Sequence, residues 1–181
     1  MESKEESPMS LSHFTTARLL LRPRSFDDLE ACLAMDRDVE VTRHIPGPWQ
    51  DPVAHRQFVE GRMRSAYPDG LGYWSIFERA APERFLGWVL LIPEDGAGSE
   101  VEIGWRLMRS AWGRGIAGEA ARAIIEHAFA TVGLTAVVAG IAAENTASRQ
   151  LAAKLGMRCP EGAPVDADGY VRYRIERACA G

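Results

Sequence analysis

Cysteine is scarce in this chain of 181 residues, which carries only Cys32, Cys159 and Cys179. The three are far apart and form no Cys-x-x-Cys pair, so neither a disulfide framework nor a zinc site is expected. Histidines are also few, four in all, and their spacing is not that of metal ligands. We therefore expect free thiols in a reducing cytosol, no metal, and a cytoplasmic location.

Long apolar runs and an excess of basic charge are absent as well. The longest unbroken apolar stretch, Phe85–Ile92, spans eight residues, whereas a membrane helix needs roughly 20. The first residues, Met1–Pro8, are acidic and polar, unlike a signal peptide. With 21 basic and 25 acidic residues the net charge is −4, which argues against general nucleic-acid binding. We expect a soluble protein that binds neither membrane nor nucleic acid.

Length and hydrophobic content predict one domain, because apolar residues make up 46% of the chain and supply a continuous core. We expect residues 1–14 to form a flexible leader and residues 15–181 a single domain. Turn residues and apolar periodicity predict the elements. The expected strands are 18–23, 72–78, 85–92, 100–108, 136–143 and 170–178. The expected helices begin at Ser25 and at Asp51 and cover 115–132 and 145–155.

These elements predict a mixed α/β fold in the order β-α-α-β-β-β-α-β-α-β-β. The sheet is expected to be twisted, mostly antiparallel and about seven-stranded, with four helices. Short connections between the strands of residues 72–108 favour an antiparallel meander. The nearly continuous apolar run Phe85–Ile92 is typical of a strand covered on both faces.

The densest chemical signal runs from Glu102 to Gly118, where a strand leads through a glycine-rich turn into a long helix. Glycines at 113, 115 and 118 let the backbone approach a ligand, and a helix N-terminus attracts phosphate. A tight turn without a ligand is the alternative. The segment also matches the dinucleotide pattern GxGxxG, but a Rossmann domain needs more parallel units and an acidic residue about 20 positions on. A dinucleotide oxidoreductase is therefore a distant third interpretation.

The segment Glu102–Met157 resembles the acetyl-CoA-binding core of the GNAT N-acetyltransferase superfamily. Within it, Trp112–Ala120 is similar to the Rim branch, the ribosomal-protein N-terminal acetyltransferases and their relatives. The opening Thr16–Pro23 and the downstream Asn145–Ser148 and Lys154–Met157 fit the same branch. Trp112 stands where the superfamily usually has Gln or Arg, a departure that is common in the Rim branch. The resemblance covers nearly the whole chain, although residues 30–75 resemble the branch only in layout.

The resemblance implies transfer of the acetyl group of acetyl-CoA to a primary amine, either a protein N-terminus or a small molecule. It implies a homodimer only as a habit of the family. Asn145 would hydrogen-bond the cofactor at the next strand–helix junction. The residues implied to hold the pantetheine arm are Leu107, Met108 and Arg109. The residues implied to hold the pyrophosphate are Gly113, Arg114, Gly115, Ile116, Ala117 and Gly118.

Direct attack on the thioester requires a neutral amine, and the resemblance makes Glu102 the base, acting through water. Its alternative is a solvated carboxylate at a strand edge. Many superfamily members use a Tyr as general acid where this chain has Ala152, and Ser148 is the branch's usual substitute. Capping the next helix is an equal alternative for Ser148. Tyr170 and Tyr173 are weaker candidates for the acid.

Trp49, in a Pro-Gly-Pro loop, lies where the branch shapes its acceptor pocket, which makes it a candidate for contact with the substrate. For the neighbouring Arg43 and His44 a solvated loop is the simpler interpretation. No cysteine has a neighbouring base in the sequence, which disfavours an acyl-cysteine mechanism. The competing class is a non-catalytic acyl-CoA-binding or sensing module on the same fold. Such a module would keep the glycines and Asn145 without needing Glu102.

Overall fold

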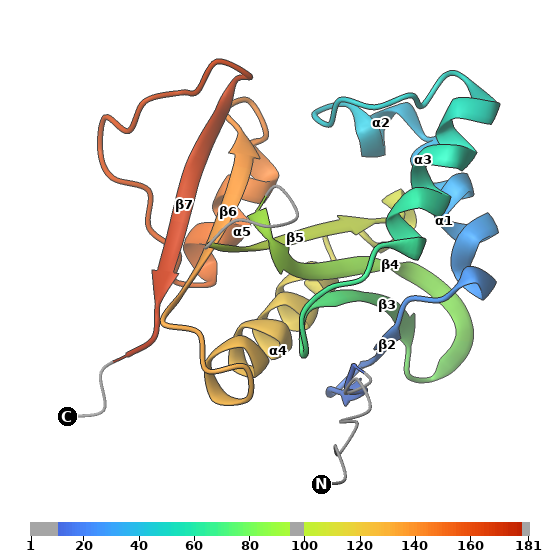
Figure 1. Ribbon diagram of the computed structural model, residues 1–181, viewed down its shortest axis with the longest axis horizontal. Coiled ribbons are helices and arrows are strands. Elements are labelled where there is room, and N and C mark those ends of the chain that lie inside the picture. Colours follow the sequence, from blue (N-terminus) through green and yellow to red (C-terminus); the bar gives the residue numbers. More distant parts are fainter. Residues whose placement is uncertain (1–10, 95–99, 179–181) are drawn as a thin grey trace, which may run out of the picture.

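A computed structural model describes residues 11–94 and 100–178, and its strands form one sheet in which they follow one another in chain order (Figure 1). Residues 1–10 of the expected leader, as well as Cys179, lie outside this range. The seven strands found among the described residues are β1 (Phe14–Thr15), β2 (Leu19–Pro23), β3 (Gly72–Glu78), β4 (Ala81–Pro93), β5 (Val101–Leu107), β6 (Ala136–Ala142) and β7 (Tyr170–Glu176).

The sheet is antiparallel between all neighbours except β5 and β6, which are parallel. These two strands pair in register at Glu102 and Val138. Beyond that point they run apart (Figure 1), so one edge of β5 is left open in the middle of the sheet. The predicted meander of β3, β4 and β5 is confirmed.

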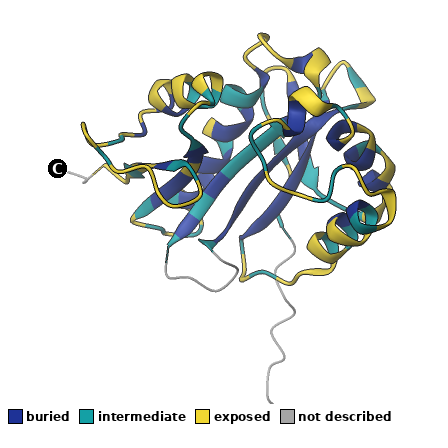
Figure 2. Ribbon diagram, turned by 90° about the horizontal axis from the view of Figure 1, so that it is seen from above, coloured by how far each residue is buried: buried dark blue, intermediate teal, exposed yellow. Residues whose placement is uncertain are grey.

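Helices cover both faces of the sheet, with α4 on one face and α1 and α3 on the other (Figure 1). Figure 2 shows the strands as the most buried part of the molecule. Val89 and Leu91 of β4 join the core beside α4, whereas Trp88 and Leu90 join the core beside α1 and α3. This two-sided burial explains the continuous apolar run of β4. The α-helices of the described residues are α1 (Leu29–Asp36), α2 (Val39–Thr42), α3 (Pro52–Arg64), α4 (Ile116–Ala130) and α5 (Thr146–Lys154).

The mixed fold and the strand count are confirmed, but two details differ from the prediction. The short helix α2 is a fifth helix within the described residues, and its cap is Asp38, which accepts from the Glu40 N–H. Between α5 and β7 the described chain forms no second strand, since prolines and glycines interrupt it; Arg158 makes one isolated bridge to Arg174. The seventh strand is instead β1, which begins at the last residue of the expected leader, where Phe14 pairs with Leu21.

Candidate active site

The turn before α4 together with the first three residues of that helix, here called the glycine loop (residues 113–118), has the backbone conformation that its sequence demands. Gly113 and Gly115 adopt φ values of +68° and +74°, in the left-handed region that disfavours other residues. A Cβ added to Gly113 would meet nothing within 4 Å, so conformation rather than space requires glycine there. Gly115 is the N-cap of α4 and supplies no side-chain hydrogen bond. The first amides of this helix are therefore available to a ligand.

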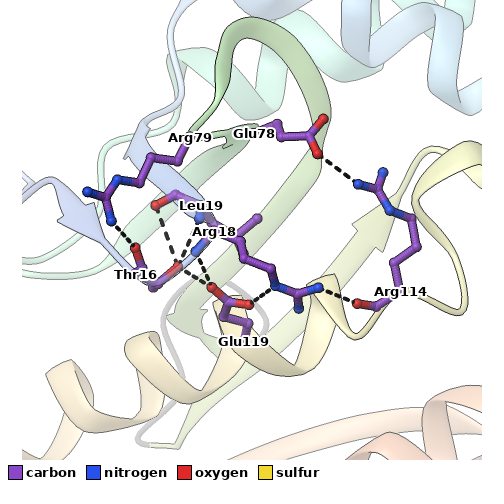
Figure 3. Close-up of polar contacts among 7 residues, drawn as sticks. All are labelled: Thr16, Arg18, Leu19, Glu78, Arg79, Arg114 and Glu119. Atoms are coloured by element: carbon purple, nitrogen blue, oxygen red, sulfur yellow. Dashed lines mark hydrogen bonds and ion pairs between the residues drawn. The ribbon is translucent and has the colours of Figure 1, made fainter.

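The glycine loop is held from outside by the β1–β2 region (Figure 3). Arg18 donates to the Arg114 carbonyl at 2.8 Å and to the Glu119 carboxylate at 2.7 Å. The Arg114 guanidinium pairs with Glu78 at 2.8 Å. Desolvation opposes ionisation of Glu119, but hydrogen bonds from Thr16 and Arg18 outweigh it and hold the Glu119 pKa below its usual value. Sequence reasoning missed Arg18, whose partners lie about a hundred residues away.

The end of β5 presents part of its backbone to the gap between β5 and β6. The Met108 N–H donates to the Leu86 carbonyl of the neighbouring strand at 2.9 Å. Alternation along a strand therefore turns the Leu107 backbone groups toward the open edge. The Trp112 indole donates to the Leu107 carbonyl at 3.1 Å. Arg109 already belongs to a short 3₁₀ turn, so Leu107 is the residue of the predicted trio that faces the gap.

Asn145 and Ser148 lie at the start of α5. The Asn145 side chain is the N-cap and accepts from the Ser148 N–H at 3.1 Å. The Ser148 hydroxyl accepts from the Trp105 indole of β5 at 3.3 Å. The helix is thus capped by Asn145 and not by the Ser148 hydroxyl, which reaches across to β5 and donates to no acceptor among the described residues.

A cavity of about 770 Å³ is bounded by α1, α3, residues 45–49 and the face of the sheet that carries Glu102 and Arg106. We call it the Trp49 cavity. Trp49 packs edge-on against His55 and Phe58, with ring centroids 5.4 and 5.6 Å apart. Its indole donates to the Ile45 carbonyl at 2.7 Å. A Cβ at Gly47 would lie 2.2 Å from the Trp49 ring, so the Pro-Gly-Pro loop needs its glycine to seat this side chain.

Glu102 connects the two regions, since it is paired with β6 and also lines the Trp49 cavity. Burial raises the pKa of its carboxyl above the ordinary 4.5, and the charge of Glu94 adds to the rise. A hydrogen bond from the Gly140 N–H, at 3.4 Å, acts in the opposite direction. Glu102 is therefore a partly desolvated carboxylate rather than a freely solvated group at a strand edge.

Asp36 and Arg106 also line the cavity, and together with the buried His55 they form a group of polar side chains that sequence reasoning missed, here called the Arg106 cluster (Asp36, His55 and Arg106). Asp36 accepts from Arg106 at 2.8 Å and lies 3.4 Å from the His55 Nε2. The guanidinium of Arg106 lies between the rings of Trp49 and Trp88, 4.9 and 5.0 Å from their centroids. Residues 102 and 106 lie on one face of β5. Polar residues at alternating positions of an otherwise apolar strand are the sequence signal that could have indicated a polar site on this face.

Of the two tyrosines considered as general acid, Tyr170 lines the cavity. Its hydroxyl donates to the His44 carbonyl at 3.0 Å, and burial raises the pKa of this hydroxyl. Tyr173 instead accepts from Arg149 at 3.1 Å, away from the cavity lining.

Within residues 11–94 and 100–178 no three His, Cys, Asp or Glu side chains are grouped to hold a metal ion. None of the helices in the same residues is long and apolar enough to cross a membrane.

Residues 18–158 match the family model of the acetyltransferase (GNAT) domain. The chain belongs to the GNAT acetyltransferase family. It is 29% identical over 179 residues to the FsC-acetyl coenzyme A-N(2)-transacetylase of Aspergillus fumigatus, with 90% of this chain and 75% of that protein covered. The chain is thus an acetyl-CoA-dependent acetyltransferase, and the enzyme class predicted from the sequence is confirmed. The dinucleotide interpretation is wrong.

Solved structures confirm the GNAT fold. An acetyltransferase from Agrobacterium tumefaciens superimposes with a TM-score of 0.77 at 25% identity, over 97% of this chain and 100% of that chain. A provisionally assigned ribosomal-protein-serine acetyltransferase from Vibrio cholerae gives a TM-score of 0.73 at 20% identity, over 93% of this chain and 100% of that chain. At that identity the second likeness concerns the fold alone.

Proposed function

We propose that this acetyltransferase acts on a primary amine, which enters the Trp49 cavity and attacks the acetyl group directly in a ternary complex. The observation that carries the proposal is the position of Glu102, whose carboxylate belongs both to the cavity wall and to the point where β5 and β6 part. A base at that point serves an amine arriving from the cavity.

The residues present fit acetyl-CoA, which supplies a thioester-activated acetyl group. The uncapped N-terminus of α4, with the glycine loop, offers backbone donors suited to a pyrophosphate. At the open edge of β5 the Leu107 N–H is offered to the pantetheine arm, while the Leu107 carbonyl accepts from the Trp112 indole. Asn145 keeps its side-chain amide hydrogens available while its oxygen caps α5.

Glu102 would remove the proton that the amine must lose. At pH 7.4 an α-amino group with a pKa of ~8 is roughly 20% neutral, and a lysine with a pKa of ~10.4 is about 0.1% neutral. A base therefore helps both, and lysine-like amines most. Because burial raises the pKa of Glu102, its carboxylate is a stronger base than an exposed one.

Direct attack is favoured over an acyl-cysteine intermediate. Cys32 lines the Trp49 cavity, but burial raises the pKa of its thiol to about 12. A thiol is a nucleophile only as thiolate, so Cys32 stays unreactive near neutral pH. Cys159 is partly buried and lies outside the cavity lining.

We assign donation of a proton to the departing thiolate to Ser148, because its hydroxyl accepts from Trp105 and retains its hydrogen, and solvent returns to the serine the proton that it gives up. Tyr170 is the second candidate for this role. The Rim-type likeness favours a protein N-terminus as acceptor, and small amines are the alternative. The homodimer and the cytoplasmic location stay predictions.

The test is release of free thiol from acetyl-CoA in the presence of amines and of short peptides with free N-termini. Glu102→Gln should keep its affinity for acetyl-CoA and lose roughly 10²- to 10⁴-fold in kcat/KM. Part of the rate should return as the pH rises and more amine is neutral.

Glu100→Gln is the matched control, since Glu100 lies just before the same strand, is half-exposed, and pairs with Arg172 and Arg174. Its rate should equal that of the unmodified protein. An unchanged rate in Glu102→Gln at pH 7 would remove Glu102 from the mechanism. Failure of every amine to release thiol, despite tight acetyl-CoA binding, would contradict transfer to a primary amine.

A further inference from the structure

Three arginines line the Trp49 cavity, and they are not equally neutralised. Arg106 pairs with Asp36, as described above. Among residues 11–94 and 100–178, no carboxylate forms an ion pair with Arg24 or with Arg62. Asp36, a carboxylate of the cavity lining, is already shared between Arg106 and His55.

Arg24 is the more deeply placed of the two unpaired cations. Its guanidinium lies 3.6 Å from the centroid of the Tyr73 ring. Burial lowers the pKa of Arg24, while Tyr73 and Cys32 oppose this effect. Partial desolvation of a guanidinium that has no carboxylate partner costs free energy, and Arg24 is in this position beside a cavity that a ligand can enter.

Arg62, from α3, lines the cavity together with Arg24 and Tyr73, and its guanidinium lies 5.3 Å from the centroid of the Phe58 ring. Burial raises the pKa of the Tyr73 hydroxyl, and the charges of Arg24 and Arg62 both oppose that rise. In addition, the Nε of Arg106 is buried and has no hydrogen-bond partner among the described residues. The cavity thus contains donors that its own side chains leave unsatisfied.

The two ends of the Trp49 cavity differ in charge. Arg24 follows β2 and Tyr73 belongs to β3, so the cationic end lies over the β2–β3 side of the sheet. Glu102 belongs to β5 and Asp168 precedes β7, so the acidic end lies over the opposite side. Arg106 of β5 lies on that side as well, but its charge is paired with Asp36. Strands β3 and β5 are two inter-strand spacings apart, roughly 10 Å.

We propose that the acceptor is a primary amine that also carries an anionic group, which Arg24 and Arg62 bind while the amine faces Glu102. Guanidinium groups bind carboxylate and phosphate oxygens through paired, charge-assisted hydrogen bonds. The inference rests on the proposed function, because it assumes that an amine occupies the acidic end. The separation of the two ends favours acceptors in which several bonds separate the amine from the anion.

The test uses pairs of amines in which one member carries an anionic group that the other lacks. One pair is 6-aminohexanoate and 6-aminohexanamide, another is phosphoethanolamine and ethanolamine, and a third is the C-terminally amidated peptides Ser-Ala-Glu and Ser-Ala-Gln. Rates are compared per neutral amine, so differences in amine pKa do not enter. In at least one pair the anionic member should show a kcat/KM higher by on the order of tenfold to a hundredfold.

Arg24→Gln and Arg62→Gln should each reduce that ratio, and Arg24→Lys should restore part of it. Arg64→Gln is the control, since Arg64 lies on the same helix, is exposed, and pairs with Glu60. Damage to the fold would lower both members of a pair equally and would leave the ratio unchanged. A ratio near one in every pair, or a ratio that both Gln variants leave intact, would overturn the inference.

A binding measurement separates this inference from the proposed function. The same pairs are titrated against the CoA-bound protein by tryptophan fluorescence, because Trp49 and Trp88 line the cavity. Equal turnover of charged and neutral amines would reject the anionic acceptor and leave amine acetylation standing. Preferential binding of the anionic members without any acetyl transfer would support the anion site and contradict the proposed function.

Discussion

The glycine loop and the Trp49 cavity occupy adjacent parts of one site but differ in the groups that they offer to a ligand. The loop offers backbone amides from six consecutive residues, positioned by two left-handed glycines and the start of α4. The cavity offers side chains from α1, α3, residues 45–49, the sheet and the segment before β7. A run of backbone donors is visible in a short stretch of sequence, whereas a cavity made of distant side chains is not.

This difference has a physical consequence for how each part fails. The glycine loop depends on a few φ angles, so a change there alters binding locally. The Trp49 cavity depends on buried polar contacts between segments, and a change there also destabilises the fold. Variants in the two parts should therefore separate into those that alter acetyl-CoA binding and those that alter acceptor binding and stability.

The largest effect is expected from Asp36→Ala. This change leaves the Arg106 guanidinium and His55 buried without their carboxylate, with side chains 9% and 2% exposed. Removing one partner of a buried ion pair costs about 3–5 kcal/mol, which urea unfolding would measure. Glu30→Ala is the control on the same helix, because Glu30 pairs with Arg56 at the surface, and it should leave the midpoint unchanged. Equal midpoints for both variants would mean that the Arg106 cluster does not hold the cavity together.

The next effect is expected from Gly113→Ala, compared with Gly133→Ala. Both glycines have positive φ, +68° and +79°, and at both an added Cβ would meet nothing within 4 Å. Each substitution should cost about 1–2 kcal/mol of stability through backbone strain. The Kd for CoA, measured by calorimetry, should rise by roughly tenfold in Gly113→Ala and stay unchanged in Gly133→Ala. A shared loss of affinity would show that the loop is sensitive only to general destabilisation.

The fold could be predicted to this extent because its signals are local. The apolar stripe of α4, the continuous apolar run of β4 and the Asp51-Pro52 start of α3 each predicted the element that formed. The short α2 was missed because four residues are too few for a helical period. β1 was missed because two residues carry no alternation, and its formation depends on pairing between Phe14 and Leu21.

The candidate site was predictable on one side only. Glu102, Asn145 and the glycine loop lie in two motifs of the segment 102–157, and the resemblance to a family supplied their roles. Arg24 and the Arg106 cluster acquire their environment from contacts across the fold, such as the 70 residues between Asp36 and Arg106. In the sequence each is an ordinary charged residue, so burial and the absence of a partner are visible only in three dimensions.

A smaller effect is expected from Arg18→Gln, because Arg18 is a side chain from a distant segment that contacts the backbone of the glycine loop. Arg18 is a distant side chain that supports the glycine loop through the Arg114 carbonyl and Glu119. Because Arg18 is half-exposed, the KM for acetyl-CoA should rise only about two- to fivefold. Arg84→Gln is the control, an exposed arginine that pairs with Glu78 without touching the loop backbone. An unchanged KM in Arg18→Gln would show that the backbone alone fixes the loop.

The smallest effect concerns stability at Glu102, where both parts of the site meet. Burial raises the pKa of Glu102 in the folded state above the ordinary 4.5. The stabilisation that accompanies a raised pKa is present below 4.5 and is lost as the pH rises through the folded pKa. Glu102→Gln, which has no charge to bury, should therefore melt at a higher temperature than the unmodified protein at pH 7 and at the same temperature near pH 4. Glu94→Gln should change stability in the opposite direction, because its hydrogen bond from Arg172 lowers the pKa of Glu94. If Glu102→Gln melts at a lower temperature than the unmodified protein at pH 7, the carboxylate stabilises the fold. Its desolvation then does not lower the stability of the protein.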